Sequence, residues 1–284
     1  MDICVCADKN YLAYVYALFE SISRFHKSDV VFHIITDESV DHDSLENIEK
    51  LIFENSIHVH KVNASEFCDL RETAHFTRAM YYRFKIPELI NKDWVLYLDC
   101  DMVVMGSLAQ LFSSKITDKP LYAVRNPFFS RRDALSLKDN RYFNSGMLLI
   151  NCKWWREQRV FEKLIDVLNR KDIDFIYPDQ DALNIVYNEW WEEVSPSYNV
   201  QYSILRRQKS AIKESKIFED AIKKPVIVHF SSPNKQWHSS CYNPYKFEYL
   251  KLQSSVQKYR FNFVKDQIAK FKGWLLYKYY NVVG

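Results

Sequence analysis

The stretch NKDWVLYLDCDMVVMGSL, residues 91–108, runs a hydrophobic strand directly into two carboxylates. Asp99 and Asp101 are separated by one residue, so their side chains point to the same side if the chain stays extended. Two carboxylates this close raise each other's pKa unless a cation lies beside them. Oxygen ligands suit Mg²⁺ or Mn²⁺, and an added histidine favours Mn²⁺. The stretch therefore predicts a divalent-metal site, with a solvated turn as the alternative.

Strand and helix patterns alternate in front of this stretch. We expect strands at 2–7, 29–37, 56–62 and 94–99, and helices at 10–26, 41–53 and 77–86, the last ending before Pro87. Such alternation implies an α/β fold whose strands pair in parallel through crossovers. Ligands bind outside the carboxyl ends of such strands. Asp99 and Asp101 follow one of these ends.

The second half of the chain continues the alternation less regularly. We expect strands near 120–124, 147–150 and 225–230, a loop at 125–140, a turn at 143–146, a helix at 151–169 and a capped helix starting at Tyr177. The only compositional break lies near residue 245. These patterns predict one large domain over 1–250 and a short tail over 251–284.

The charge of the chain is unevenly distributed. The formal net charge is +3, but residues 251–284 contain seven Lys or Arg and one acid, so the remaining body is slightly acidic. This excludes a nucleic-acid-binding body and points to a basic tail. The tail carries Phe261, Val264, Ile268, Phe271 and Leu275 on one helical stripe edged by lysines. That pattern predicts an interfacial helix on an anionic membrane; the alternative is a helix docked on the protein itself.

The sequence also carries indications of cellular location. The beginning, MDICVCAD, has no signal-peptide pattern, and no run reaches the roughly 20 apolar residues that span a membrane. The six cysteines are scattered, as in a reduced interior. We therefore expect a cytoplasmic protein that is peripherally associated with the inner face of the cell membrane.

Six ordered segments resemble glycosyltransferase family 8. They are CADKNYLAYV, AMYYRFKIPELI, VLYLDCDMVV, YFNSGMLLINCKWWR, YPDQDALN and HFSSPNKQWH, within residues 1–250. The likeness is strongest to bacterial α-galactosyl- and α-glucosyltransferases that build lipopolysaccharide. It implies a GT-A nucleotide-sugar-binding fold with a mostly parallel central sheet. It also implies retaining transfer of glucose or galactose from a UDP-sugar to a glycan acceptor, which the basic tail suggests is lipid-linked.

The resemblance assigns metal and nucleotide ligands. Asp99, Asp101 and His229 would bind Mn²⁺, with Mg²⁺ as the alternative, and Lys235 would hold the diphosphate. The nucleotide would also contact Ala7, Asp8, Asn10, Tyr11 and Cys100. From the residues alone, His229 is a structural residue at a strand end and Lys235 a solvated loop lysine. Asp8 or Asn10 could equally cap the following helix.

The resemblance also assigns the sugar-binding side. The donor sugar would contact Arg83, Asn144, Ser145, Asp179 and Gln180. Gln180 lies near the anomeric carbon in this reading, and because an amide is a poor nucleophile we favour front-face attack. Asp181 is the reserve candidate for a covalent catalytic role, and helix capping by Asp179 or Asp181 is the alternative. The acceptor would contact His75, Tyr177 and the loop at 198–208.

Two positions depart from the family pattern, and two other functions compete. Ser232 stands where the family has a glycine that permits close approach of the backbone to phosphate, and Gln236 stands where proline is common. A haloacid-dehalogenase-type phosphatase also uses Asp-x-Asp after a strand, but on the first strand of its domain, whereas three strands come first here. A non-catalytic nucleotide-sugar-binding relative would be free to lose Asp99, Asp101, His229 or Lys235, and all four are present.

Overall fold

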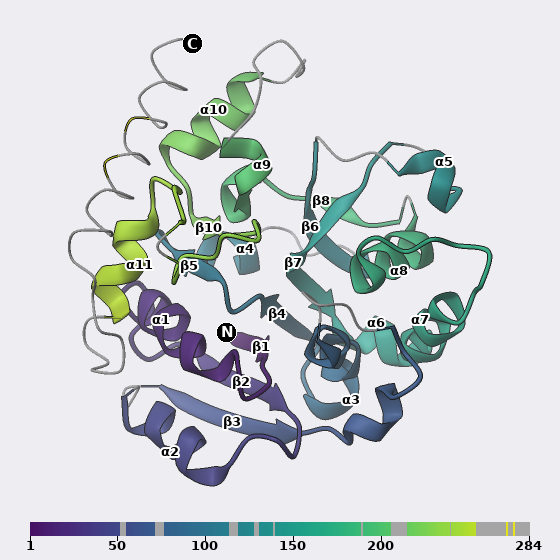
Figure 1. The fold of residues 1–284 in the computed structure, drawn as a ribbon, viewed down its shortest axis with the longest axis horizontal. Helices are drawn as coiled ribbons and strands as arrows, with labels where there is room; N and C mark the ends of the chain where they lie inside the picture. The colour runs from purple at the N-terminus through teal and green to yellow at the C-terminus, as the bar shows by residue number, and fades with distance from the viewer. Residues whose placement is uncertain are drawn as a thin grey trace.

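Two β-sheets form the centre of the protein (Figure 1). The computed structural model describes residues 1–51, 55–71, 77–113, 119–127, 131–138, 140–188, 190–205, 215–238, 240–253, 271 and 275. The larger sheet has seven strands in the order β3-β2-β1-β4-β7-β6-β8, and the smaller has three in the order β5-β10-β9.

The seven-stranded sheet is mixed and mostly parallel. Parallel neighbours are β3 (Ser56–Lys61), β2 (Val31–Thr36), β1 (Asp2–Cys6) and β4 (Trp94–Leu98). Strand β7 (Phe143–Asn151) runs antiparallel between β4 and β6 (Leu121–Arg125), and β8 (Glu192–Glu193) extends the edge in parallel. The predicted α/β class with a mostly parallel central sheet is confirmed.

Helices cover both faces of this sheet, which explains why its central strands are apolar throughout. Ile3 and Val5 pack with α1 (Leu12–Ser23), whereas Cys4 and Cys6 face the opposite cluster. The remaining elements are α2 (His42–Leu51), η1 (Ala64–Phe67), η2 (Arg78–Lys85), α3 (Ile86–Leu89), α4 (Ala109–Ser113), α5 (Arg132–Leu135), α6 (Cys152–Glu157), α7 (Val160–Leu168), α8 (Pro178–Tyr187), η3 (Pro196–Tyr198), α9 (Tyr202–Leu205), α10 (Ser215–Lys223) and α11 (Lys246–Gln253).

The three-stranded sheet brings distant parts of the chain to the end of β4. Strand β10 (Ile227–His229) pairs antiparallel with β5 (Met102–Val104), with His229 opposite Met102. On its other side His229 lies opposite Gln201 of β9 (Val200–Gln201). The Phe230 amide donates to the Asp101 carbonyl at 3.0 Å. This pairing fixes the histidine beside the two aspartates.

Several local predictions were wrong in detail. The segment before Pro87 is a 3-10 helix, and Pro87 lies in the first turn of α3, where its missing N–H is tolerated. The expected turn at 143–146 belongs to β7. The helix expected over 151–169 breaks at Arg159, whose φ is 51°.

The end of the described chain bears on the predicted tail. Helix α11 crosses the expected boundary at residue 250, and Tyr249 and Leu252 are buried in one cluster with Val228 and Phe230. Beyond Gln253 only Phe271 and Leu275 are described, and both are exposed. Apart from these two positions, the predicted membrane helix lies outside the described residues. Within the described part of the chain, no helix has the length and apolar character needed to cross a membrane.

Candidate functional site

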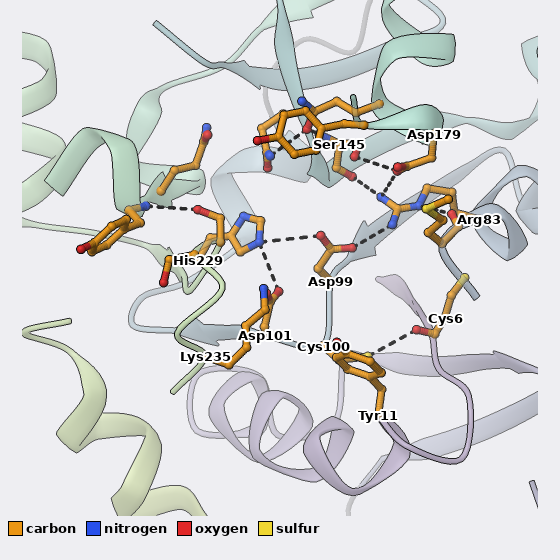
Figure 2. A pocket seen from close by; sticks show the side chains of 18 of the residues that line it. Cys6, Tyr11, Arg83, Asp99, Cys100, Asp101, Ser145, Asp179, His229 and Lys235 are labelled. Carbon is orange, nitrogen blue, oxygen red and sulfur yellow. Dashed lines mark hydrogen bonds and ion pairs between the residues drawn. The ribbon is translucent and has the colours of Figure 1, made fainter. Parts of the chain in front are cut away.

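A cavity of about 410 Å³ opens beyond the ends of β1 and β4 (Figure 2). The larger sheet contributes side chains from β7 and from the segments that follow β1 and β4. Further groups come from η2, from the start of α8 and from the loop after β10. Those on which the site depends are Tyr11, Arg83, Tyr97, Asp99, Cys100, Asp101, Asn144, Ser145, Tyr177, Asp179, Gln180, His229 and Lys235.

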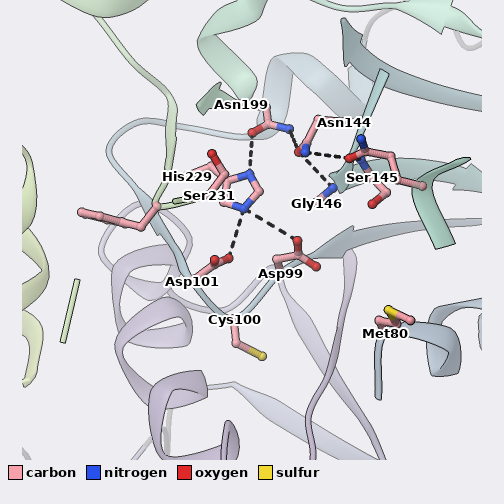
Figure 3. A network of polar contacts seen from close by, with 12 residues as sticks. Met80, Asp99, Cys100, Asp101, Asn144, Ser145, Gly146, Asn199, His229 and Ser231 are labelled. Atoms are coloured by element: carbon pink, nitrogen blue, oxygen red, sulfur yellow. Dashed lines mark hydrogen bonds and ion pairs between the residues drawn. The ribbon is translucent and has the colours of Figure 1, made fainter. Parts of the chain in front are cut away.

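Asp99, Asp101 and His229 form a cluster suited to a cation (Figure 3). One potential ligand atom from each lies within 4.8 Å of the others. Nε2 of His229 is 3.7 Å from Asp99 Oδ2 and 3.1 Å from Asp101 Oδ1. These three atoms therefore face a common point.

The second oxygen of each carboxylate is already engaged. Asp99 Oδ1 accepts from Arg83 Nη2 at 3.1 Å and from the Tyr97 hydroxyl at 2.5 Å. Asp101 Oδ2 accepts from Lys235 Nζ at 2.5 Å. Tyr97 reaches Asp99 because side chains alternate along a strand, so residues two apart lie on one side. These contacts fix which oxygen each aspartate presents to the cluster.

Two further observations show that the residues fit a divalent metal. Asp101 Oδ1 is buried and accepts no hydrogen bond within the described part of the protein, and such an atom needs a compensating partner. Gly146 supplies the space: a Cβ there would lie 2.7 Å from Asp99 Oδ2 and in contact with His229 Cε1. The φ of Gly146 is not left-handed, so its backbone conformation does not require glycine. The close approach of Asp99 and His229 does. The donor set of two carboxylates and one imidazole is typical of divalent-metal sites.

Charge pairing keeps the cluster ionised. Burial alone raises the pKa of Asp101, but the Lys235 ammonium, which donates to Asp101 Oδ2, outweighs burial and holds this pKa well below its usual value. Burial likewise lowers the pKa of Lys235, yet the adjacent Asp101 carboxylate leaves it raised overall. The ammonium and the carboxylate are therefore both charged at neutral pH.

Arg83 links this cluster to the α8 side of the cavity. Its guanidinium donates to the Ser145 carbonyl at 2.7 Å and lies 3.4 Å from Asp179 Oδ2. Burial opposes its charge, but the neighbouring Tyr97, Asp99 and Asp179 raise its pKa overall. Ser145 Oγ donates to Asp179 Oδ2 at 3.0 Å. Burial raises the pKa of Asp179 despite Arg83.

Some predicted nucleotide residues do not line the cavity. Ala7 is fully buried. Asp8 accepts from the backbone amides of Asn10 and Tyr11 at 2.8 and 3.1 Å, so it stabilises the turn before α1. The N-cap of α1 itself is Tyr11 and has no side-chain hydrogen bond, so neither Asp8 nor Asn10 caps this helix. Asn10 is exposed. Tyr11, by contrast, lines the cavity.

Asp181 and Gln180 have different surroundings. Gln180 lines the cavity. Asp181 is 0% exposed and is not among the lining residues. Its Oδ1 accepts from the Tyr142 hydroxyl at 2.6 Å, and its Oδ2 from Arg131 Nη1 at 2.9 Å and from the backbone amides of residues 176 and 177. Both oxygens are therefore committed to holding α8 in place.

The remaining predicted positions divide between the cavity and the interior. Tyr177 and Ser232 line the cavity, while Gln236 is fully buried and does not face it. His75 lies outside the described residues. Sequence reasoning missed Tyr97, which strand alternation could have indicated. It also missed Asn199, for which no sequence signal exists because its neighbouring strand is only two residues long.

Comparisons with known proteins agree with this geometry. Residues 2–241 match the model of glycosyl transferase family 8. General stress protein A of Bacillus subtilis is 32% identical over 89% of this chain and 93% of its own length. The lipopolysaccharide glucosyltransferase WaaO of Escherichia coli K12 is 31% identical over 84% and 73%. The galactosyltransferase LgtC, solved with donor and acceptor sugar analogs, superposes with a TM-score of 0.81 at 26% identity over 94% and 100%.

Proposed function

Because this chain belongs to glycosyltransferase family 8, we propose that it transfers glucose or galactose from a UDP-sugar to a glycan acceptor with retention of configuration. The observation that carries the proposal is the cluster of Asp99, Asp101 and His229 beside the Lys235 ammonium in a cavity of about 410 Å³, a volume typical of small-molecule sites. Relatives that transfer glucose and galactose support the choice of hexose.

The proposed cofactor is Mn²⁺, with Mg²⁺ as the alternative. Asp99 Oδ2, Asp101 Oδ1 and His229 Nε2 would hold it, and the imidazole ligand favours manganese. When bound, the metal supplies positive charge that balances the donor diphosphate. Asp101 Oδ1, which otherwise accepts no hydrogen bond within the described residues, then has a partner.

Lys235 is the proposed electrostatic partner of the leaving group. Its ammonium stays protonated because Asp101 lies beside it. A fixed positive charge where the departing UDP gains negative charge stabilises the transition state. Tyr11 and Cys100 line the same cavity and are proposed to contact the nucleoside and diphosphate, with Asp8 and Asn10 shaping the turn beneath them.

Front-face attack is the proposed mechanism. The bond from the anomeric carbon to the diphosphate oxygen breaks, the acceptor hydroxyl oxygen bonds to that carbon on the same face, and its proton passes to the departing phosphate. A double displacement would need a carboxylate at the reacting carbon. Asp181 has both oxygens engaged away from the cavity, which disfavours that role. Gln180 is proposed to steady the cationic sugar, while Arg83, Asn144, Ser145 and Asp179 bind its hydroxyl groups.

The acceptor and its location are proposed from less direct observations. Tyr177 lines the cavity and is proposed to contact the acceptor, together with His75. The basic aromatic tail and the lipopolysaccharide relatives support a lipid-linked glycan at the cytoplasmic face of the membrane. Vesicle co-sedimentation tests the tail. Anionic vesicles should retain the protein and neutral ones should not, and triple substitution of Lys258, Lys265 and Lys272 by glutamine should release it.

UDP release from a panel of UDP-sugars in MnCl₂ tests the proposed activity. The wild type should hydrolyse one UDP-hexose slowly without acceptor, and Asp101→Ala should lower that rate at least about 100-fold. Asp172→Ala is the control, because this aspartate is exposed and outside the cavity. Donor binding without turnover for every sugar and acceptor would favour a non-catalytic relative. Phosphate release from simple phosphoesters would favour a phosphatase.

A further inference from the structure

A continuous chain of hydrogen bonds joins the metal cluster to Gln180 of α8. Figure 3 shows its first part, from His229 through Asn199 to Asn144. His229 Nδ1 lies 3.0 Å from Asn199 Oδ1, and Asn199 Nδ2 donates to Asn144 Oδ1 at 2.8 Å. Asn144 Nδ2 donates in turn to Gln180 Oε1 at 2.8 Å. Gln180 Nε2 then donates to the Tyr142 hydroxyl at 2.9 Å. Asn199 is 0% exposed, so water does not substitute for these contacts.

Two backbone amides set the direction of every bond in this chain. The N–H of Gly146 donates to Asn144 Oδ1 at 3.1 Å, and the N–H of Ser145 donates to Gln180 Oε1 at 3.0 Å. Backbone amides can only donate, so both side-chain atoms must be oxygens. Asn199 must then present its NH₂ group to Asn144, which leaves its oxygen facing His229. A flip of any amide would set two donors or two acceptors against each other.

The direction of the chain fixes the form of the imidazole. Because Asn199 Oδ1 can only accept, the proton of neutral His229 lies on Nδ1. The lone pair of Nε2 is then directed at the oxygens of Asp99 and Asp101, where a metal ligand is needed. A partner on the second imidazole nitrogen is a general means of orienting a metal-binding histidine. Here that partner is the side-chain amide of Asn199, whose NH₂ group donates to Asn144 on the donor-sugar side of the cavity.

We propose that Asn199 is a positioning residue that couples His229 on the metal side to Asn144 and Gln180 on the sugar side. The proposal rests on the proposed function, since it assumes that the cluster binds a metal and that Gln180 faces the sugar. Asn199 touches neither group. It acts by holding His229 in the form that binds metal and by holding Asn144 in the orientation that places Gln180.

Two substitutions separate the two ends of this side chain. Asn199→Asp keeps an oxygen for His229 Nδ1 but sets a second oxygen against Asn144 Oδ1. Asn144 should then turn its NH₂ group to the new carboxylate and release Gln180. Asn199→Leu, which is similar in size, removes both contacts. The aspartate variant should therefore lose turnover but keep metal affinity, whereas the leucine variant should lose both.

The first measurement is made with Mg²⁺ and UDP bound, because Mg²⁺ is diamagnetic and a cation is then present beside His229 Nε2, Asp99 and Asp101. Imidazole ¹⁵N NMR reports which nitrogen of His229 carries the proton, and the His229→Gln variant assigns the signal. Wild type and Asn199→Asp should show the proton on Nδ1, and Asn199→Leu should lose this preference. Calorimetric titration of Mn²⁺ with UDP should then give an affinity in Asn199→Leu that is lower by about 10- to 100-fold, and in Asn199→Asp one at least equal to wild type. The kcat for donor hydrolysis should fall in both variants, with KM for the donor nearly unchanged in Asn199→Asp.

The outcomes distinguish this inference from the proposed function. An unchanged tautomer and unchanged Mn²⁺ affinity in Asn199→Leu would overturn the positioning role, even if the wild type is an active transferase. Equal loss of metal affinity in both variants, with lowered thermal midpoints, would also overturn it, because that is the signature of a merely structural residue. Binding of metal and UDP without turnover of any sugar, together with a His229 tautomer that depends on Asn199, would support the positioning role and refute the proposed transferase activity.

Discussion

Replacing Gly146 with alanine should block the metal cluster without disturbing the fold. The new Cβ would lie 2.7 Å from Asp99 Oδ2, 3.0 Å from Asn144 Oδ1 and in contact with His229 Cε1. Since Gly146 has no left-handed φ, alanine can adopt its backbone conformation. The effect therefore comes from the methyl group alone.

The size of the effect follows from these distances. Ordinary van der Waals contact begins at 3.4 Å, so Asp99 Oδ2 must move away by about 0.7 Å. Metal–ligand distances vary by only about 0.2 Å around their preferred values. Asp99 cannot turn freely, because Arg83 and Tyr97 hold its other oxygen. We expect metal affinity to fall about 10- to 100-fold, or about 1.4 to 2.8 kcal/mol.

Calorimetric titration of Mn²⁺ in the presence of UDP measures this loss, and UDP release should fall in parallel. Gly106→Ala is the matched control, because a Cβ there would meet Val226 at 3.7 Å, an ordinary contact. Both variants should unfold within a few degrees of wild type. Wild-type Mn²⁺ affinity in Gly146→Ala would refute the assignment of the cluster as the metal site.

Three other predictions concern charge. Lys235→Met should lower kcat/KM for the donor by about 100-fold or more, since it removes the cation beside the leaving group, and steady-state UDP release checks this. Arg131→Met should lower the free energy of unfolding in urea by about 3–5 kcal/mol, because it leaves the buried Asp181 carboxylate without its cation; an unchanged midpoint would contradict the structural role of Asp181. Burial lowers the pKa of His33 and His60 below the unfolded value of 6.5, so the unfolded state binds more protons and stability should fall as the pH drops below about 6.5. Thermal midpoints at pH 7.5 and 5.5 should differ less in His33→Gln than in wild type.

The sequence predicts the metal aspartates because they depend on local geometry. An apolar run followed by Asp99 and Asp101 indicates a strand end. In the structure β4 ends at Leu98 and the chain turns at residues 100–101, but the two aspartates are so near in sequence that both reach the same site. The histidine is different, since His229 reaches the aspartates only through the pairing of β10 with β5. That contact spans more than a hundred residues, and periodicity carries no information on it. The assignment of His229 to the metal cluster came from the family resemblance instead.

The difference between local geometry and tertiary structure also explains the wrong predictions for residues 143–146 and for Asp181. The FNSG segment contains polar and small residues that suggest a turn, but β7 uses them inside a strand because their side chains face the cavity and Gly146 leaves room for the metal cluster. Asp181 follows Gln180 directly and has the chemistry of a nucleophile. Only the tertiary structure reveals that Arg131 and Tyr142 engage both of its oxygens.

The most direct test of the account is the affinity for UDP with and without Mn²⁺. Calorimetry on the wild type should show tight UDP binding in Mn²⁺ and much weaker binding in EDTA. The difference should disappear in Asp101→Asn, which removes a metal ligand charge with little change in size. UDP affinity that is the same with and without Mn²⁺ in the wild type would contradict the central claim that Asp99, Asp101 and His229 bind a metal that holds the donor.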